Sequence, residues 1–289
     1  MGSGMKTGTS ERPDLPVAVV IGAGGMGTSA ARRLGNHYRI ILADIDARVA
    51  EERAAAMRAD GYDARHHRCD ITDPASVDRL ADAVAAAGPL RAIAHVAAKS
   101  PSMGTWREIL TLNLIGAAQV ERAMLRLAER GTAAVFVSSV AAHLVRDPGP
   151  ETIALLDDPL ASGFFEALEE LVAEQTPAVA YSLSKTALNR MCVRRASAWG
   201  RRHARIVSMS PGMIATPMGA REFAGASRSA KAELLERTPL QREGTMIETA
   251  DAIEFLLSSR ASYITGVDLL VDGGVSAATC FPEEGRSRP

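Results

Sequence analysis

The stretch Val17-Ala-Val-Val-Ile21-Gly22-Ala-Gly24-Gly-Met26-Gly27 decides the fold of this chain. Its five apolar residues predict a buried strand, and a helix is predicted from Met26 to Leu34. In such a unit the first glycine permits a tight turn, the second lets the backbone approach a pyrophosphate, and the third lets the helix pack on the strand. The helix N-terminus then offers free N–H groups to phosphates. We therefore expect a dinucleotide-binding loop, although glycines also serve ordinary turns. Its candidate residues are Gly22, Gly24, Met26 and Gly27.

Strands and helices are expected to alternate along the rest of the chain. That alternation predicts βαβ units and a parallel sheet buried on both faces. No linker rich in Pro or Gly divides the chain, so the sequence predicts an α/β fold with a single Rossmann domain over residues 17–275. The sheet is expected to be doubly wound, with about seven strands and helices on both faces. Strands are expected at 17–21, 39–43, 63–68, 91–95, 133–137, 204–208 and 267–271, and helices at 26–34, 47–59, 74–87, 106–129, 182–199 and 247–257.

Composition excludes several classes of protein. The formal net charge of the 289 residues is −1, which gives no electrostatic reason to expect a nucleic acid or an anionic membrane as partner. No apolar run approaches the ~18 residues of a membrane span. Residues 1–16 lack the apolar stretch of a signal peptide and are expected to be disordered or derived from a tag. Three cysteines without close spacing favour the reducing cytoplasm and indicate no metal site.

Asp44 lies 22 residues after Gly22, at the end of the second expected strand. This spacing suits a carboxylate that binds the ribose hydroxyls of NAD. A 2′-phosphate at ~4 Å would be repelled by roughly 4 kcal/mol at a dielectric constant of about 20, and half of that is roughly 30-fold in affinity. Two alternatives stay open. Asp44 could merely cap the next helix, or nearby Arg48 could outweigh it and favour NADPH.

Tyr181-Ser-Leu-Ser-Lys185 places a phenol and an ammonium at positions i and i+4, next to each other on one helical face. A free phenol has a pKa near 10, and a neighbouring cation lowers it. Such a pair can exchange a proton with an alcohol or a carbonyl oxygen. An exposed helical pair without a catalytic role is the alternative.

Together with the glycine loop, this pair resembles the short-chain dehydrogenase/reductase family, in its compact single-domain branch, from about Val17 to Gly274. Members carry a Ser after the fifth strand that binds the substrate oxygen, and here Val135-Phe-Val-Ser138-Ser139-Val140 matches it through Ser139. They also carry an Asn within a helix, which holds a water in a proton relay towards the lysine. Asn113 matches that residue. The resemblance therefore implies a catalytic set of Asn113, Ser139, Tyr181 and Lys185.

Other family positions imply further contacts with NAD. Asp70 resembles the residue that contacts the adenine ring, with Ile71 beside it. Pro211-Gly-Met-Ile214-Ala-Thr216 resembles the segment that holds the nicotinamide carboxamide. The resemblance thus adds these cofactor-binding residues: Asp70, Ile71, Ala97, Tyr181, Lys185, Pro211, Ile214 and Thr216.

Two departures from the family pattern concern the cofactor side. Ile21 stands where members have a Thr, and the glycine loop is one residue shorter. His95-Val-Ala-Ala98 stands where members have Asn-Asn-Ala-Gly. We expect His95 to replace an Asn that braces strands, and a catalytic histidine is the alternative.

Ser139 and Tyr181 lie 42 residues apart, against about a dozen in most compact members. The acidic insertion, about 144–178, carries Phe164, Leu168 and Leu171 at helical spacing. This apolar stripe could pack on its own domain, on a second subunit or over the substrate. Similar insertions occur in bacterial members resembling 3α-hydroxysteroid dehydrogenases, where they alter subunit contacts. A homodimer or a homotetramer is expected.

The expected function follows from these residues and the resemblance. An apolar loop over about 213–241 matches the family's substrate lid and favours an apolar substrate. Residues 276–289 are expected to form a tail. The prediction is an NAD-dependent enzyme that interconverts a secondary alcohol and a ketone of a steroid, terpenoid or aromatic compound. An NADPH-preferring carbonyl reductase and a non-catalytic nucleotide sensor are the alternatives, and the intact catalytic set argues against the sensor.

Overall fold

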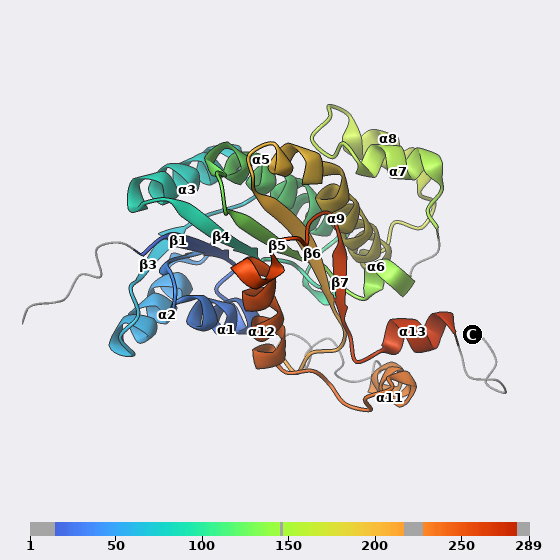
Figure 1. Cartoon of the computed structure of the whole chain (residues 1–289). Helices are drawn as coiled ribbons and strands as arrows, with labels where there is room; N and C mark the ends of the chain where they lie inside the picture. Colours follow the sequence, from blue (N-terminus) through green and yellow to red (C-terminus); the bar gives the residue numbers. More distant parts are fainter. Residues whose placement is uncertain (1–14, 145–146, 217–227, 282–289) are drawn as a thin grey trace, which may run out of the picture.

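Seven parallel strands form one sheet in the order β3-β2-β1-β4-β5-β6-β7 (Figure 1). The computed structural model describes residues 15–144, 147–216 and 228–281. The doubly wound Rossmann fold predicted from the sequence is therefore confirmed. The strands are β1 (Val17–Ile21), β2 (Arg39–Asp44), β3 (Ala64–Arg68), β4 (Leu90–His95), β5 (Ala133–Val137), β6 (Arg205–Pro211) and β7 (Asp268–Val271).

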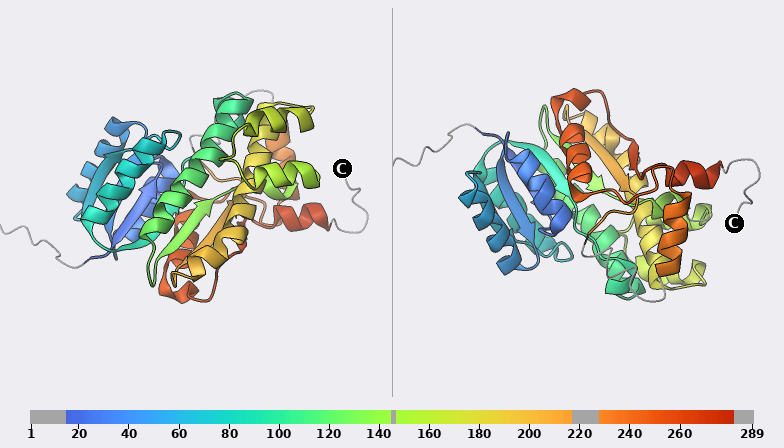
Figure 2. Two further views of the ribbon diagram at one scale, coloured as in Figure 1. Left: turned by 90° about the horizontal axis from the view of Figure 1, so that it is seen from above. Right: turned by 90° about the horizontal axis from the view of Figure 1, so that it is seen from below.

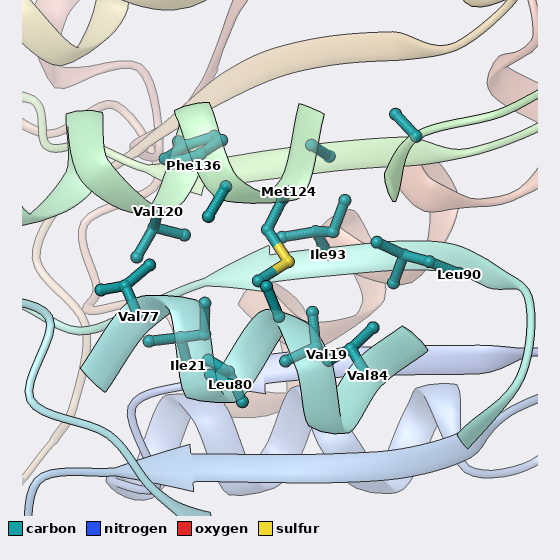
Figure 3. Close-up of a cluster of buried hydrophobic side chains, with 14 of the residues drawn as sticks. Val19, Ile21, Val77, Leu80, Val84, Leu90, Ile93, Val120, Met124 and Phe136 are labelled. Atoms are coloured by element: carbon teal, nitrogen blue, oxygen red, sulfur yellow. The ribbon is translucent and has the colours of Figure 1, made fainter. Parts of the chain in front are cut away.

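Helices cover both faces of this sheet (Figure 2). One face carries α3 (Pro74–Ala87), α5 (Ala117–Leu127) and α9 (Pro177–Gly200), and the other carries α1 (Gly25–Leu34), α2 (Ala47–Ala59) and α12 (Met246–Leu257). Successive strand residues point to opposite faces, so β1 contributes to both cores. Figure 3 shows the first core, where side chains of β1 and β4 meet those of α3 and α5.

The ends of several helices follow from capping residues. Asp46 accepts hydrogen bonds at the start of α2, and Asp73 does so for α3, which begins with Pro74. Both helices have the predicted bounds. The long helical stretch predicted over 106–129 is present from 106 to 127, but it is not regular: α4 (Trp106–Leu110) passes into the π-helical segment η2 (Thr111–Gly116) and then into α5.

The insertion forms two short helices, α7 (Pro150–Leu156) and α8 (Phe164–Leu171). Phe164 and Leu168 are buried in a core shared with α4 and α9, whereas Leu171 is 42% exposed. Arg107 of α4 binds Glu169 in a bidentate pair, with Nε 2.7 Å from Oε1. The apolar stripe therefore packs on its own domain, and Leu171 is not part of it.

Four short helical segments complete the chain: η1 (Pro101–Met103), α6 (Ala141–Leu144), η4 (Ser259–Ala261) and α13 (Val275–Cys280). The segment expected to be a tail begins with α13, because Asp272 accepts hydrogen bonds from the backbone N–H groups of Gly274 and Ser276. Within the expected lid, α11 (Arg228–Arg237) is helical rather than a loop. Residues 1–14, and Met218 and Phe223 of the expected lid, lie outside the described residues.

Candidate active site

The turn after β1 requires glycine at two positions. Gly22 has φ +103°, and a Cβ there would lie 2.7 Å from the Ala97 backbone nitrogen. A Cβ on Gly27 would lie 1.8 Å from the Gly22 carbonyl oxygen. The positive φ admits little but glycine, and neither close contact with backbone could relax. The tight turn and the close helix–strand packing expected of these two glycines are both present.

Gly24 differs from its neighbours because the space beside it is open. A Cβ on Gly24 would meet no heavy atom within 4 Å. Gly24 is also the N-cap of α1, and no side chain caps this helix, in contrast to α2. The first-turn N–H groups of a helix have no partner within the helix. An open, uncapped helix start fits the pyrophosphate of a dinucleotide, and Met26 lies in this first turn.

Asp44 connects the end of β2 to the glycine loop. Its Oδ2 accepts a hydrogen bond from the Ala23 backbone N–H at 2.6 Å, and its Oδ1 accepts one from Asp46 at 3.0 Å. Asp46, not Asp44, caps α2, so the capping alternative is wrong. Arg48 is paired with Glu52 at 2.8 Å. Sequence reasoning missed Ile45, whose 54% exposed side chain offers an apolar surface beside Asp44.

Asp70 and Ile71 follow β3 at the same edge of the sheet. Asp70 Oδ1 accepts hydrogen bonds from the Thr72 N–H and hydroxyl, at 2.9 and 2.7 Å. Ile71 is buried, and a Cβ on Gly116 would approach its Cγ1 to 2.8 Å. Because the carboxyl ends of parallel strands meet at one edge, Asp44, Asp70 and the glycine loop lie at the same edge of the sheet.

Lys185 is the central group of the catalytic candidates. It is only 2% exposed, and its Nζ donates a hydrogen bond to the Val137 carbonyl oxygen at 3.0 Å. Burial lowers the pKa of Lys185 from 10.5 to about 7. Nζ also lies 5.6 Å from the centre of the Tyr181 ring. The helix α9 begins at Pro177, capped by Thr176, so Tyr181 and Lys185 are one helical turn apart.

The two serines after β5 face different surroundings. Ser138 is buried, and its hydroxyl donates to the Lys185 carbonyl oxygen at 3.1 Å. Ser139 is partly exposed, and its Oγ accepts a hydrogen bond from the Ala141 N–H at 3.2 Å. Ser138 thus joins β5 to α9, which leaves Ser139 as the more accessible of the two serines. No sequence pattern indicated the role of Ser138.

Asn113 lies in the π-helical segment and is 1% exposed. Its side-chain amide accepts from the Lys99 N–H at 2.8 Å and donates to the Lys99 carbonyl at 2.9 Å. It also donates to Ser184 Oγ at 3.4 Å, and Ser184 donates to the Tyr181 carbonyl at 2.7 Å. Asn113 therefore connects the chain after β4 with the helix that carries Tyr181.

His95 is 1% exposed, and its ring stacks on Phe136 with centroids 5.1 Å apart. Neither ring nitrogen has a hydrogen-bond partner among the described residues. Burial, with a smaller effect of the Lys185 charge, lowers the pKa of His95 from 6.5 to about 3. His95 therefore braces β4 and β5 by stacking rather than by the hydrogen bonds expected of an Asn, and it stays neutral at physiological pH.

The segment after β6 is held against its neighbours through backbone contacts. Pro211 ends β6 and accepts a hydrogen bond from the Val140 N–H at 2.9 Å. Ile214 is 9% exposed and pairs with Gly244 in an isolated β-bridge. Thr216 is the last residue described before 217–227, and it is partly buried. Pro211 thus lies beside the loop that follows Ser139, and Ile214 lies beside Gly244.

Over the described ranges, no group of three or more His, Cys, Asp or Glu side chains could hold a metal ion. Within the same ranges, no helix combines the length and the apolar character needed to cross a membrane.

The comparison with known proteins agrees with this geometry. One family profile, described as "short chain dehydrogenase", matches residues 16–150, and another, described as "Enoyl-(Acyl carrier protein) reductase", matches residues 167–276. A short-chain dehydrogenase/reductase of Alternaria brassicicola, bsc3, is 33% identical over 263 residues, which are 90% of this chain and 95% of the relative. The chain belongs to the short-chain dehydrogenase/reductase family.

Two more relatives support this assignment. The 3-alpha-hydroxysteroid dehydrogenase/carbonyl reductase of Comamonas testosteroni is 32% identical over 234 residues, covering 74% of this chain and 89% of the relative. The structure of a short-chain type dehydrogenase/reductase from Mycobacterium ulcerans superposes with a TM-score of 0.74 at 24% identity, covering 91% of this chain and 90% of that chain. The protein is thus an oxidoreductase of a family that binds a nicotinamide cofactor.

Proposed function

We propose that this dehydrogenase/reductase uses NAD(H) to interconvert a secondary alcohol and a ketone. The observation that carries the proposal is the buried Lys185 ammonium beside the Tyr181 ring. Burying a lysine costs free energy, and a neutral donor would satisfy the Val137 carbonyl oxygen without the cost of burying a charge. A cation held there favours the phenolate form of Tyr181, which is what proton exchange with an alcohol requires.

Each catalytic candidate then has one role. Tyr181 takes the proton of the alcohol in oxidation and returns it to the carbonyl oxygen in reduction. Ser139 donates a hydrogen bond to that oxygen, Lys185 supports the phenolate and binds the nicotinamide ribose, and Asn113 holds a water that relays protons towards Lys185. The nicotinamide, when bound, accepts or gives the hydride.

The residues at the cofactor cleft fit NAD(H). Gly22, Gly24, Met26 and Gly27 would receive the pyrophosphate, because the start of α1 is open and uncapped. Asp44 would bind the adenosine ribose hydroxyls, since its carboxylate is fixed beside the loop by two backbone N–H groups. The remaining contacts would come from these residues: Asp70, Ile71, Ala97, Pro211, Ile214 and Thr216.

An apolar substrate is proposed from the apolar composition of the expected lid. A cavity of about 450 Å³ lies between this segment and β7, and its lining combines Met213, Ile214 and Leu240 with charged residues such as Arg242, Glu248 and Asp272. The similarity to a relative named for a 3-alpha-hydroxysteroid supports the same class. A steroid, a terpenoid or an aromatic ketone or alcohol is therefore the proposed substrate.

We also propose that the enzyme is a homo-oligomer, with a dimer favoured over a tetramer. The insertion covers the outer faces of α4 and α9, whereas the edge strand β7 exposes Leu269 and Leu270, at 37% and 41%. Exposed apolar side chains on a strand edge favour pairing with a second copy. Light scattering on the purified protein would give the mass, and a monomer at micromolar concentration would refute the proposal.

Cys69 and Cys192 are buried free thiols, which supports a cytoplasmic location.

Tyr181→Phe tests the proposed chemistry. The variant keeps the ring and loses only the hydroxyl, so NADH should still quench tryptophan fluorescence with unchanged affinity. Turnover of apolar secondary alcohols with NAD⁺ should fall by about 10²-fold or more. Near-normal turnover would refute the proposed role of Tyr181. Tighter binding of NADPH than of NADH would favour the carbonyl reductase alternative, and nucleotide binding without turnover of any alcohol or ketone would favour the sensor.

A further inference from the structure

Arg68 is the last residue of β3 and lies directly opposite Asp44. The parallel register of the two strands pairs Asp44 with Arg68. Neighbouring parallel strands lie about 4.8 Å apart, and paired residues point to the same face of the sheet. Ile40, Leu42 and Ala64 belong to the core on the α1 and α2 face, so Asp44 and Arg68, two or four residues further along, also point to that face.

The Arg68 guanidinium is available to a ligand. Arg68 is exposed, and its side chain forms no hydrogen bond or ion pair with any residue of the described ranges. Two other arginines on this side are already engaged: Arg48 binds Glu52 at 2.8 Å, and Arg58 binds Glu51 at 2.9 Å. Arg48, the residue that sequence reasoning set against Asp44, is therefore a weaker candidate for a phosphate than Arg68.

We propose that Arg68 is a specificity-determining residue that binds an adenosine 2′-phosphate. The preference between NADH and NADPH would then depend on two opposing charges: Asp44 disfavours the 2′-phosphate and Arg68 favours it. This inference rests on the proposed dinucleotide site. Asp44 is held in place by Ala23 and Asp46, so a 2′-phosphate beside it meets a fixed negative charge. The same phosphate would lie next to a guanidinium, which suits phosphate geometry through bidentate hydrogen bonds.

The opposing effects of Asp44 and Arg68 on NADPH affinity have two measurable consequences. In the otherwise unchanged protein, Arg68→Gln should weaken NADPH binding by about tenfold, the size of one exposed charge-assisted contact, and leave NADH binding unchanged. When the Asp44 charge is removed by Asp44→Ser, NADPH binding should strengthen by roughly 30-fold without any added basic residue. In the double variant that combines Asp44→Ser with Arg68→Gln, the gain in NADPH affinity should be about tenfold smaller than in Asp44→Ser alone.

The experiment measures the dissociation constants of NADH and NADPH for the full chain by fluorescence titration at low ionic strength, where surface charges are least screened. The proteins are the unchanged enzyme, Arg68→Gln, Asp44→Ser, the double variant and Arg65→Gln. Arg65 is a matched control: it is also exposed on β3, but its side chain points to the opposite face. Adenosine 2′,5′-bisphosphate and 5′-AMP serve as fragments that isolate the phosphate contact.

The expected result is a loss confined to NADPH and to the bisphosphate, present in Arg68→Gln and absent in Arg65→Gln. Equal losses for NADH and NADPH would overturn the inference, because Arg68 would then contact the shared adenosine. A similar loss in Arg65→Gln would overturn it too, since the effect would be one of net charge. If the unchanged enzyme binds neither cofactor, the proposed function itself fails, and this inference fails with it.

Discussion

Replacing Lys185 by Met should make the protein more stable while removing its proposed activity. Burial lowers the pKa of the ammonium from 10.5 to about 7. At pH 7 this difference corresponds to a cost of about 4 kcal/mol in the free energy of unfolding. Met has a similar length and no charge, but it leaves the Val137 carbonyl without its donor, which costs about 1–2 kcal/mol. The net expectation is a gain of about 2–3 kcal/mol at pH 7.

The pH dependence of the free energy of unfolding tests the burial of Lys185 more specifically than the gain in stability at pH 7. Because the unfolded chain binds the proton up to pH 10.5 and the folded chain releases it near pH 7, the free energy of unfolding should rise with pH between these values. From pH 6 to pH 9 the rise due to Lys185 is about 3 kcal/mol. Lys185→Met should lack this rise, so the two curves should converge as the pH increases.

Urea unfolding at pH 6, 7, 8 and 9, at one fixed protein concentration, measures these differences. Lys99→Met is a matched control, because the Lys99 side chain is 29% exposed and pairs with Glu108 at the surface. The control should keep the pH dependence of the unchanged protein. Curves for Lys185→Met and the unchanged protein that run parallel would refute the reasoning, because Lys185 would then carry no burial cost.

Two further predictions each compare two substitutions in the same segment. Gly24→Ala should leave the thermal unfolding temperature unchanged but weaken NADH binding, because its Cβ meets open space where the pyrophosphate is proposed. Gly27→Ala should lower the unfolding temperature, because its Cβ would lie 1.8 Å from the Gly22 carbonyl oxygen. Unchanged NADH affinity in Gly24→Ala would contradict the proposed phosphate site. Leu168→Ala should cost about 2–5 kcal/mol in urea unfolding, whereas Leu171→Ala on the same helix should stay within about 0.5 kcal/mol. Equal effects of the two would mean that α8 does not pack on α4 and α9 in solution.

Much of the fold could be predicted because one pattern repeats through the chain. The alternation of apolar strands and helices indicated the parallel sheet, and two helices have the predicted bounds, their first residues being fixed by the N-caps Asp46 and Asp73. The chain between 144 and 178 was harder. It contains α7, which the apolar spacing did not reveal, and Leu171 shares the spacing of Leu168 but faces solvent. Spacing shows which residues share a helix face, but it does not show how far the buried part of that face extends.

The start of α9 shows a second limit. The helix was expected from Ser182, which would have left Tyr181 outside it, yet the predicted adjacency of Tyr181 and Lys185 needs both in one helix. The structure resolves this inconsistency, because Thr176 caps the helix and Pro177 opens it. A Thr-Pro pair followed by small and apolar residues was a readable start signal that sequence reasoning missed.

The candidate site consists of side chains that are proposed to act on ligands and of backbone atoms that hold these side chains in place. Asp44, Tyr181 and Lys185 could be proposed because their chemistry requires particular side chains, and Ser139 could be proposed from the family resemblance. Their partners are mostly backbone atoms: the Val137 carbonyl for Lys185, and the Ala23 N–H for Asp44. Any residue type supplies such atoms, so no sequence pattern marks them.

For Asn113, the proposed role depends on whether the side chain acts on a ligand or holds the backbone in place. Its amide is committed to both backbone groups of Lys99, so the side chain fixes the chain after β4 rather than pointing freely into the cleft. The π-helical segment around it changes the regular i to i−4 pairing of the helix at the turn that contacts α9. The water that Asn113 is proposed to hold would therefore be positioned by this turn. Changes that straighten the π-helical segment should then impair proton transfer even when all four catalytic side chains are kept.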